Sequence, residues 1–107
     1  MSNIIVSNME MIPGRRIKSH LGMVQGSTVR AKHAGKDILA SLKNIVGGEL
    51  KAYTELMQEA REEATERMLE QAASIGADAI MNVRYTTTSV TMGAAEILAY
   101  GTAVTLE

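Results

Sequence analysis

The sequence has no cysteine, no phenylalanine and no tryptophan, and it contains one proline and three tyrosines among 107 residues. Without cysteine the chain has neither a disulfide framework nor a thiolate metal site. Because aromatic side chains usually supply much of the buried apolar area of a small core, we expect the core of this chain to be marginal. Association with other subunits would then add stability.

Long apolar segments are absent as well. No run approaches the roughly 20 residues that span a bilayer, and the N-terminus carries no secretory hydrophobic segment. These features predict a cytoplasmic protein with no membrane partner.

The net charge of −1 is unevenly distributed. Residues 11–48 hold seven basic residues and one acidic residue, whereas residues 49–107 hold four basic and ten acidic residues. The whole domain lacks the basic surplus and the aromatic platforms of a nucleic-acid binder, so no nucleic-acid partner is expected. The charges are either solvated or placed so that a basic surface of one copy meets an acidic surface of the next.

One long helix is the strongest local prediction. After Gly47-Gly48, apolar residues recur at spacings of three and four and predict a helix over residues 50–75 that ends at Gly76. The predicted buried stripe consists of Tyr53, Leu56, Met57, Ala60, Ala64, Met68, Ala72 and Ile75. The opposite face is rich in glutamate. A shorter helix is predicted over residues 37–46, with Asp37 in its first turn and Lys43 in its last.

Three strands are predicted at residues 16–32, 79–90 and 95–106 from alternating and β-branched patterns. A tight loop between the last two would place Tyr85 near Tyr100 on one face, beside Leu98. The other face of the last strand carries small residues that a helix could approach closely. The predicted fold is therefore α+β, with a long and a short helix on a three-stranded antiparallel sheet of order 1-3-2. Residues 1–107 form one domain, and residues 1–13 form an N-terminal arm. Within it the β-prone run Ile4-Ile5-Val6 predicts an edge strand or part of an arm, and Pro13-Gly14 predicts a turn.

Seven ordered motifs carry a resemblance to a known family. They are Leu21-Gly22 with Val24 and Gly26, Val29-Arg30, Asp37-Ile38-Leu39-Ala40, Leu42-Lys43-Asn44-Ile45-Val46-Gly47-Gly48, Ala60-Arg61-Glu62-Glu63-Ala64, Gly76-Ala77-Asp78-Ala79 and Ala99-Tyr100-Gly101-Thr102-Ala103-Val104. Together they resemble the YbjQ-like family of uncharacterised bacterial and archaeal proteins, also called the putative heavy-metal-binding domain. The resemblance covers about residues 14–106.

This resemblance implies a dodecin-subunit-like fold assembled as a ring, typically a homopentamer. It implies no catalytic, cofactor-binding or metal-binding residue, because the family has none with an established role. The chain departs from the family pattern at Ile38, where phenylalanine is frequent, and at Glu49, where arginine is common.

The candidate metal ligands are sparse. His20 and His33 lie thirteen residues apart without a third ligand at helical or hairpin spacing, so a zinc site within one chain is not expected. Met9 and Met11 offer two thioethers on one side of an extended segment, which would suit Cu(I) or simply belong to an arm. The glutamate face could attract divalent cations, but ion pairs such as Glu63 with Arg67 favour a solvated surface.

Catalytic patterns are also missing. The sequence has no Gly-x-Ser-x-Gly elbow, and Gly47-Gly48-Glu49-Leu50-Lys51 lacks the ending of a P-loop. Asp37, Asp78 and the glutamates could act as acids or bases in a cleft between subunits.

The expected protein is a cytoplasmic ring that binds a small ligand or metal between its subunits. A dedicated heavy-metal-binding protein is the alternative, and an enzyme with an intersubunit active site is the third, less favoured reading. No cofactor is identified.

Overall fold

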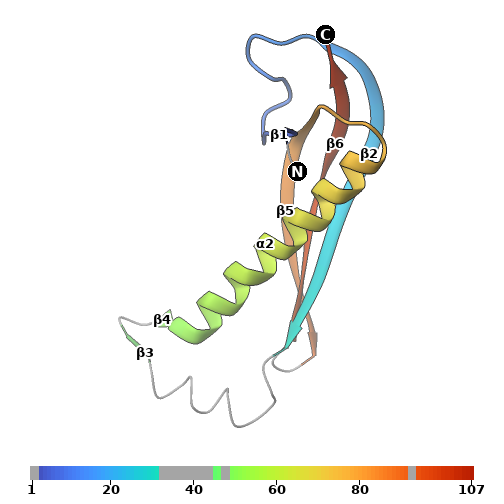
Figure 1. Ribbon diagram of the computed structural model, residues 1–107. Helices are drawn as coiled ribbons and strands as arrows, with labels where there is room; N and C mark the ends of the chain where they lie inside the picture. Colours follow the sequence, from blue (N-terminus) through green and yellow to red (C-terminus); the bar gives the residue numbers. More distant parts are fainter. Residues whose placement is uncertain (1–2, 32–44, 47–48, 92–93) are drawn as a thin grey trace.

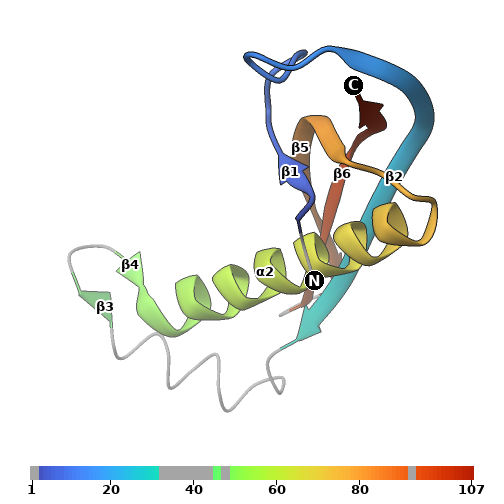
Figure 2. The ribbon, with the colours of Figure 1, turned by 45° about the horizontal axis from the view of Figure 1, so that its top comes forward.

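The computed structural model describes residues 3–31, 45–46, 49–91 and 94–107 (Figure 1). Its elements are β1 (Ile5–Val6), β2 (Ile17–Ala31), β3 (Ile45–Val46), β4 (Glu49–Leu50), α2 (Lys51–Ser74), β5 (Ala79–Thr91) and β6 (Ala94–Leu106). Helix α2 lies obliquely across one face of a long, twisted sheet. Strands β3 and β4 form a separate ribbon at the N-terminal end of the helix (Figures 1 and 2).

The main sheet has four strands in the order β1-β5-β6-β2. The long strands β5 and β2 each pair antiparallel with β6, which lies between them. The predicted three-stranded antiparallel sheet is wrong, because β1 pairs parallel with β5 and makes the sheet mixed. The sequence showed Ile4-Ile5-Val6 as a β-prone run, but two residues carry no information about which distant strand they join. Hydrogen bonds from Ile5 N to Asp78 O and from Ser7 N to Ile80 O fix that pairing.

The predicted combination of a long and a short helix is also wrong, since α2 is the one helix among the described residues. Residues 45–46, placed in the short helix, form strand β3 and pair with β4. Isoleucine and valine favour strands, and this local preference prevails over the apolar spacing there. Residues 37–44 of that prediction lie outside the described residues.

The centre of α2 packs on the sheet as its apolar spacing predicted. Ala60, Ala64, Met68 and Ala72 are fully buried at successive intervals of four residues. They meet the small face of β6, formed by Ala95, Ile97, Ala99, Gly101 and Ala103, and the inner face of β2. At Gly26 the backbones come so close that a Cβ atom would collide with Met68 N and Ala64 O.

The ends of the predicted stripe are not buried. Tyr53 and Ile75 are exposed, and Leu56 and Met57 are half-buried. The N-terminal part of α2 extends beyond the edge of the sheet (Figure 2), so the stripe continues where the described residues offer little to cover it.

The C-terminus of α2 ends as predicted. Gly76 has φ of +80°, and its N–H donates to Ala73 O while Ala77 N donates to Ala72 O. These two bonds are those of a Schellman motif with glycine at C′. The turn directs the chain into β5.

A bulge in β5 overturns the predicted pairing of Tyr85 with Tyr100. The register shifts between Met81 and Arg84, and Asn82 takes φ of +55°. Arg84 therefore pairs with Tyr100, and Tyr85 pairs with Ala99 on the helix side. One extra residue reverses which side chains face the helix. Asparagine adopts a positive φ more readily than most residues, and the sequence contains no local pattern that predicts it here.

The N-terminal arm covers one end of the sheet face opposite α2. Its Pro13-Gly14 turn is confirmed by a bond from Arg15 N to Ile12 O and by φ of +78° at Gly14. The turn seats Ile12 against a second core cluster of Ala79, Met81, Val104 and Leu106. The remainder of that sheet face is left without cover by the described residues.

Candidate functional site

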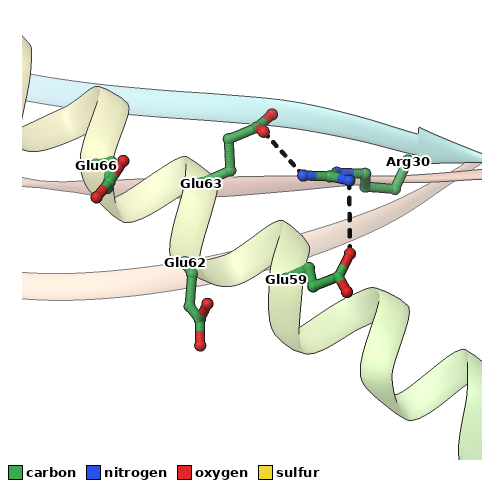
Figure 3. Close-up of a pocket in the computed structure, with 5 residues that line it drawn as sticks. All are labelled: Arg30, Glu59, Glu62, Glu63 and Glu66. Atoms are coloured by element: carbon green, nitrogen blue, oxygen red, sulfur yellow. Dashed lines mark hydrogen bonds and ion pairs between the residues drawn. The ribbon is translucent and has the colours of Figure 1, made fainter.

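An acidic hollow lies along the exposed side of α2. It measures about 370 Å³ and is lined by Arg30, Glu59, Glu62, Glu63 and Glu66. The glutamates come from two consecutive turns of the helix, and Arg30 reaches them from β2 (Figure 3). Four carboxylates around one guanidinium make this surface electronegative.

Glu63 is the best-anchored residue of the hollow. One carboxylate oxygen, Oε1, accepts a hydrogen bond from Thr28 Oγ1 at 2.6 Å and lies 3.0 Å from Arg67 Nη2. The other, Oε2, accepts from Arg30 Nη2 at 2.8 Å. The predicted pair of Glu63 with Arg67 is thus confirmed, and it belongs to a larger network that ties the helix to β2.

This network lowers the pKa of Glu63 from its ordinary value of 4.5. The hydrogen bond from Thr28 is the largest cause, and the positive charges of Arg30 and Arg67 act in the same direction against partial burial. The carboxylate is therefore ionised and engaged at neutral pH. This arrangement suits charge pairing better than proton transfer.

The remaining glutamates of the hollow are arranged differently. Glu59 points toward Arg30, with Oε2 at 3.7 Å from Nη1, whereas the carboxylate of Glu62 points away from it (Figure 3). Glu62 and Glu66 are both exposed. The hollow can attract cations from solution, but its carboxylates diverge.

The described residues do not fit a metal site within one chain. No three histidine, aspartate or glutamate side chains among residues 3–31, 45–46, 49–91 and 94–107 converge to hold a metal ion. His20 is exposed on β2, and His33 lies outside the described residues. Met9 and Met11 are exposed on the arm. The heavy-metal reading therefore finds no ligand set in this part of the chain.

The acid-base candidates do not meet either. The Oδ2 atom of Asp78 accepts a hydrogen bond from Leu106 N at 2.8 Å, so this side chain joins the start of β5 to the end of β6. Asp37 and the Gly47-Gly48 pair lie outside the described residues. Sequence reasoning missed Thr28 and Arg30 as partners of Glu63, although two polar residues on the helix-facing side of β2 were the available signal.

The second distinctive surface is the uncovered part of the sheet face opposite α2. Alternation along β2 and β6 brings Met23, Val29, Leu98 and Tyr100 to this face. Met23 is 70% exposed and Val29 57% exposed, while Leu98 and Tyr100 are half-buried. The same registers place Gln25, Arg84 and Glu96 on this face, so its exposed apolar side chains alternate with polar ones.

No helix within the described residues is long and apolar enough to cross a membrane.

Three comparisons place the chain among known proteins. A family model described as "Putative heavy-metal-binding" matches residues 4–107. A UPF0145 protein of Hahella chejuensis is 60% identical over 104 residues, which are 97% of this chain and 100% of the relative. UPF0145 proteins of Thermus thermophilus and Archaeoglobus fulgidus are 62% and 58% identical over 97% and 96% of this chain, and over 91% and 95% of the relatives.

The fold has a counterpart among solved structures. A protein of unknown function from Pediococcus pentosaceus, assigned to the DUF74 family, superposes with a TM-score of 0.61 at 16% identity. The alignment covers 99% of this chain and 100% of that one, which supports the fold alone. From the family match and the relatives together, the chain belongs to the YbjQ family of UPF0145 proteins.

Proposed function

We propose that the protein works as a cytoplasmic homo-oligomeric ring, with five subunits as the expected number, that binds a small ligand or a metal ion between its subunits. The shape of the chain carries this proposal. Its accessible surface is 6924 Å², whereas a compact monomer of this mass would expose about 5,800 Å². The excess of about 1,100 Å² exceeds the roughly 800 Å² that one partner buries in a standard interface.

The dimensions of the chain support the same conclusion. It measures 53 × 25 × 22 Å, with a radius of gyration of 16.9 Å, whereas a compact domain of this length has about 13 Å. An elongated subunit with an uncovered apolar sheet face is stabilised by contact with further copies. A site between copies would also allow ligands from two chains to converge where one chain supplies too few.

Native mass spectrometry of the purified protein tests both parts of the proposal. We expect a single oligomeric species whose mass exceeds a whole multiple of the subunit mass by that of a bound ligand or metal ion. Sedimentation velocity at micromolar concentration provides the independent measurement. A well-folded monomer in both experiments would refute the ring.

A dedicated heavy-metal-binding protein is the second candidate. The description of the family favours it, whereas the carboxylates of the acidic hollow diverge. Structural metal sites depend on a complete ligand set. If metal binds between subunits that are already folded, it is not required for folding, and melting curves with and without a chelator should coincide. A drop of tens of degrees on chelation would make this candidate the leading one.

Whether the acidic hollow binds metal can be tested directly. A variant with Glu59, Glu62 and Glu66 changed to glutamine keeps the Glu63 network and removes three carboxylates. Loss of retained metal in this variant, measured by elemental analysis, would assign the hollow to metal binding. Unchanged retention would exclude these three side chains as ligands. Catalysis is not part of the proposal.

A further inference from the structure

A bulge in β2 brings His20 and Met23 to the same face of the sheet. Residues three apart on a regular strand lie on opposite faces, because side chains alternate. Here the register with β6 shifts between His20 and Gly22, and Gly22 has φ of +109°, which side-chain-bearing residues rarely adopt. Leu21 packs on the helix side, and Gly22 pairs with Ala103 of the same cluster. Two consecutive residues thus face α2, so both His20 and Met23 lie on the opposite face.

The partners of these two residues on β6 agree with this placement. His20 pairs with Val104, which belongs to the core cluster beneath the N-terminal arm, and Met23 pairs with Thr102. Val104 and Thr102 are two residues apart on one strand, a spacing of about 7 Å. His20 is exposed and Met23 is 70% exposed. An imidazole nitrogen and a thioether sulfur that extend from positions this close can bind one ion between them.

A second methionine lies beside Thr102 but belongs to the core. Met81 of β5 pairs with Thr102 from the other side, next to the bulge at Asn82. It is 6% exposed and packs with Ile12 of the arm. One chain therefore presents a pair of soft ligands on this face, and a complete ligand set needs further groups from outside the chain.

The chemistry of the pair favours a soft, monovalent metal ion. Thioether sulfur selects Cu(I), and imidazole also binds copper. Ca²⁺ and Mg²⁺ require carboxylate and other oxygen ligands, whereas β2, β5 and β6 contain one acidic residue, Glu96, which lies three pairs from Thr102 on this face. Arg84 lies in the pair next to Thr102, opposite Tyr100. Its positive charge repels a divalent cation about twice as strongly as a monovalent one.

We infer that the sheet face opposite α2 takes up a soft monovalent metal ion, with the imidazole of His20 and the thioether of Met23 as two of its ligands. This inference rests on the proposed function and names the metal class and the ligands that each copy contributes. The uncovered sheet face is also where contact with a further copy is expected, so that copy supplies the remaining ligands.

Nuclear magnetic resonance of the methionine methyl groups tests the assignment. Ag(I) serves as the probe, because it shares the charge and softness of Cu(I) and is stable in air. The wild-type oligomer, labelled with ¹³C at the methionine methyl groups, is titrated with Ag(I) in chloride-free buffer. We expect the Met23 resonance, identified by its absence in Met23→Leu, to shift, whereas that of the fully buried Met68 should not. An equimolar amount of Zn(II) should not reverse the shift, and reversal would overturn the soft-ion class.

Two variants remove the ligands one at a time. Met23→Leu keeps an apolar side chain of similar size, and His20→Gln keeps a polar one, both at exposed positions. We expect each to weaken Ag(I) binding by roughly tenfold or more, as measured by isothermal titration calorimetry, with the melting temperature of the metal-free protein unchanged. The control Met9→Leu with Met11→Leu removes two exposed thioethers of the arm and should bind Ag(I) as the wild type does.

The outcomes separate this site from the proposed oligomer. An oligomer whose Met23 resonance does not respond to Ag(I), or whose binding is lost in the Met9 and Met11 control, overturns the site and leaves the oligomer in place. Native mass spectrometry of the same samples reports the subunit number. A monomeric wild-type protein would refute the oligomer and, with it, the second copy as the source of the remaining ligands.

Discussion

At Gly26 a single hydrogen atom decides how closely helix and sheet approach. A Cβ atom there would collide with backbone atoms of Ala64 and Met68 and lie 2.8 Å from the carbonyl carbon of Arg67. Backbone cannot rotate away as a side chain can, so the helix would have to shift. We expect Gly26→Ala to lower the free energy of unfolding by about 1–3 kcal/mol, as measured by urea denaturation. Ser27→Ala on the opposite sheet face should have little effect, and equal losses would disprove this account.

Glu63 gives stability a defined dependence on pH. Its folded pKa lies below its ordinary value of 4.5, mainly through the hydrogen bond from Thr28 and then through Arg30 and Arg67. The resulting stabilisation is complete above about pH 4.5 and is lost as pH falls through the folded pKa. Denaturation at several pH values should show that Glu63→Gln is less stable at pH 7 and loses less stability on acidification. Glu62→Gln, whose carboxylate points away from Arg30, should retain the wild-type profile.

Among the elements, α2 stabilises the fold in two ways, because it covers the sheet and also caps the edge of β2. Replacing Arg67 and Gln71 together with alanine would free the backbone groups of Gln25 and Ser27. We expect this double variant to aggregate faster on mild heating, as followed by light scattering. Glu66→Ala with Glu70→Ala removes charges from the same helix without exposing the edge. If this control also aggregates faster, the aggregation of the Arg67 and Gln71 double variant arises from changed charge and not from the exposed edge.

The sequence predicted those parts of the elements that local chemistry determines. Small apolar residues at intervals of four located the buried centre of α2, and Gly76 located its end. It could not predict the bulge at Asn82. Asparagine adopts both left-handed and extended conformations, and the flanking residues do not indicate which of the two it takes. The pairing of β1 with β5 and the contact of Arg30 with Glu63 join residues far apart in the chain. Such contacts depend on the assembled fold, so the candidate site was predicted only as a glutamate face with one ion pair.

For the whole molecule, the uncovered sheet face gives the sharpest test of assembly. Leu98 and Tyr100 lie on this face, whereas Tyr85 lies on the helix side. If another copy covers the face, an aspartate there would be buried without a partner, at a cost of several kcal/mol per subunit. We expect Leu98→Asp and Tyr100→Asp to abolish assembly and to lower stability together, as measured by sedimentation and thermal melting.

Glu59→Gln serves as the matched control, because it alters the exposed side of α2 and should leave both assembly and stability unchanged. Assembly that persists in Leu98→Asp and Tyr100→Asp would show that this face is not an interface.

The central position of β6 has a consequence for how the protein is made. A ribosome synthesises β6 after every other described element, yet β2 and β5 pair only through it, and α2 packs partly on its small face. Until residues 94–106 have left the exit tunnel, β2 has no strand to pair with and β5 can pair only with the two residues of β1. The apolar stripe of α2 then lacks the small face of β6. Folding of the sheet is therefore delayed until the last strand emerges, and a nascent chain that stalls before β6 presents a long unpaired strand and an uncovered helix to the chaperones of the cell.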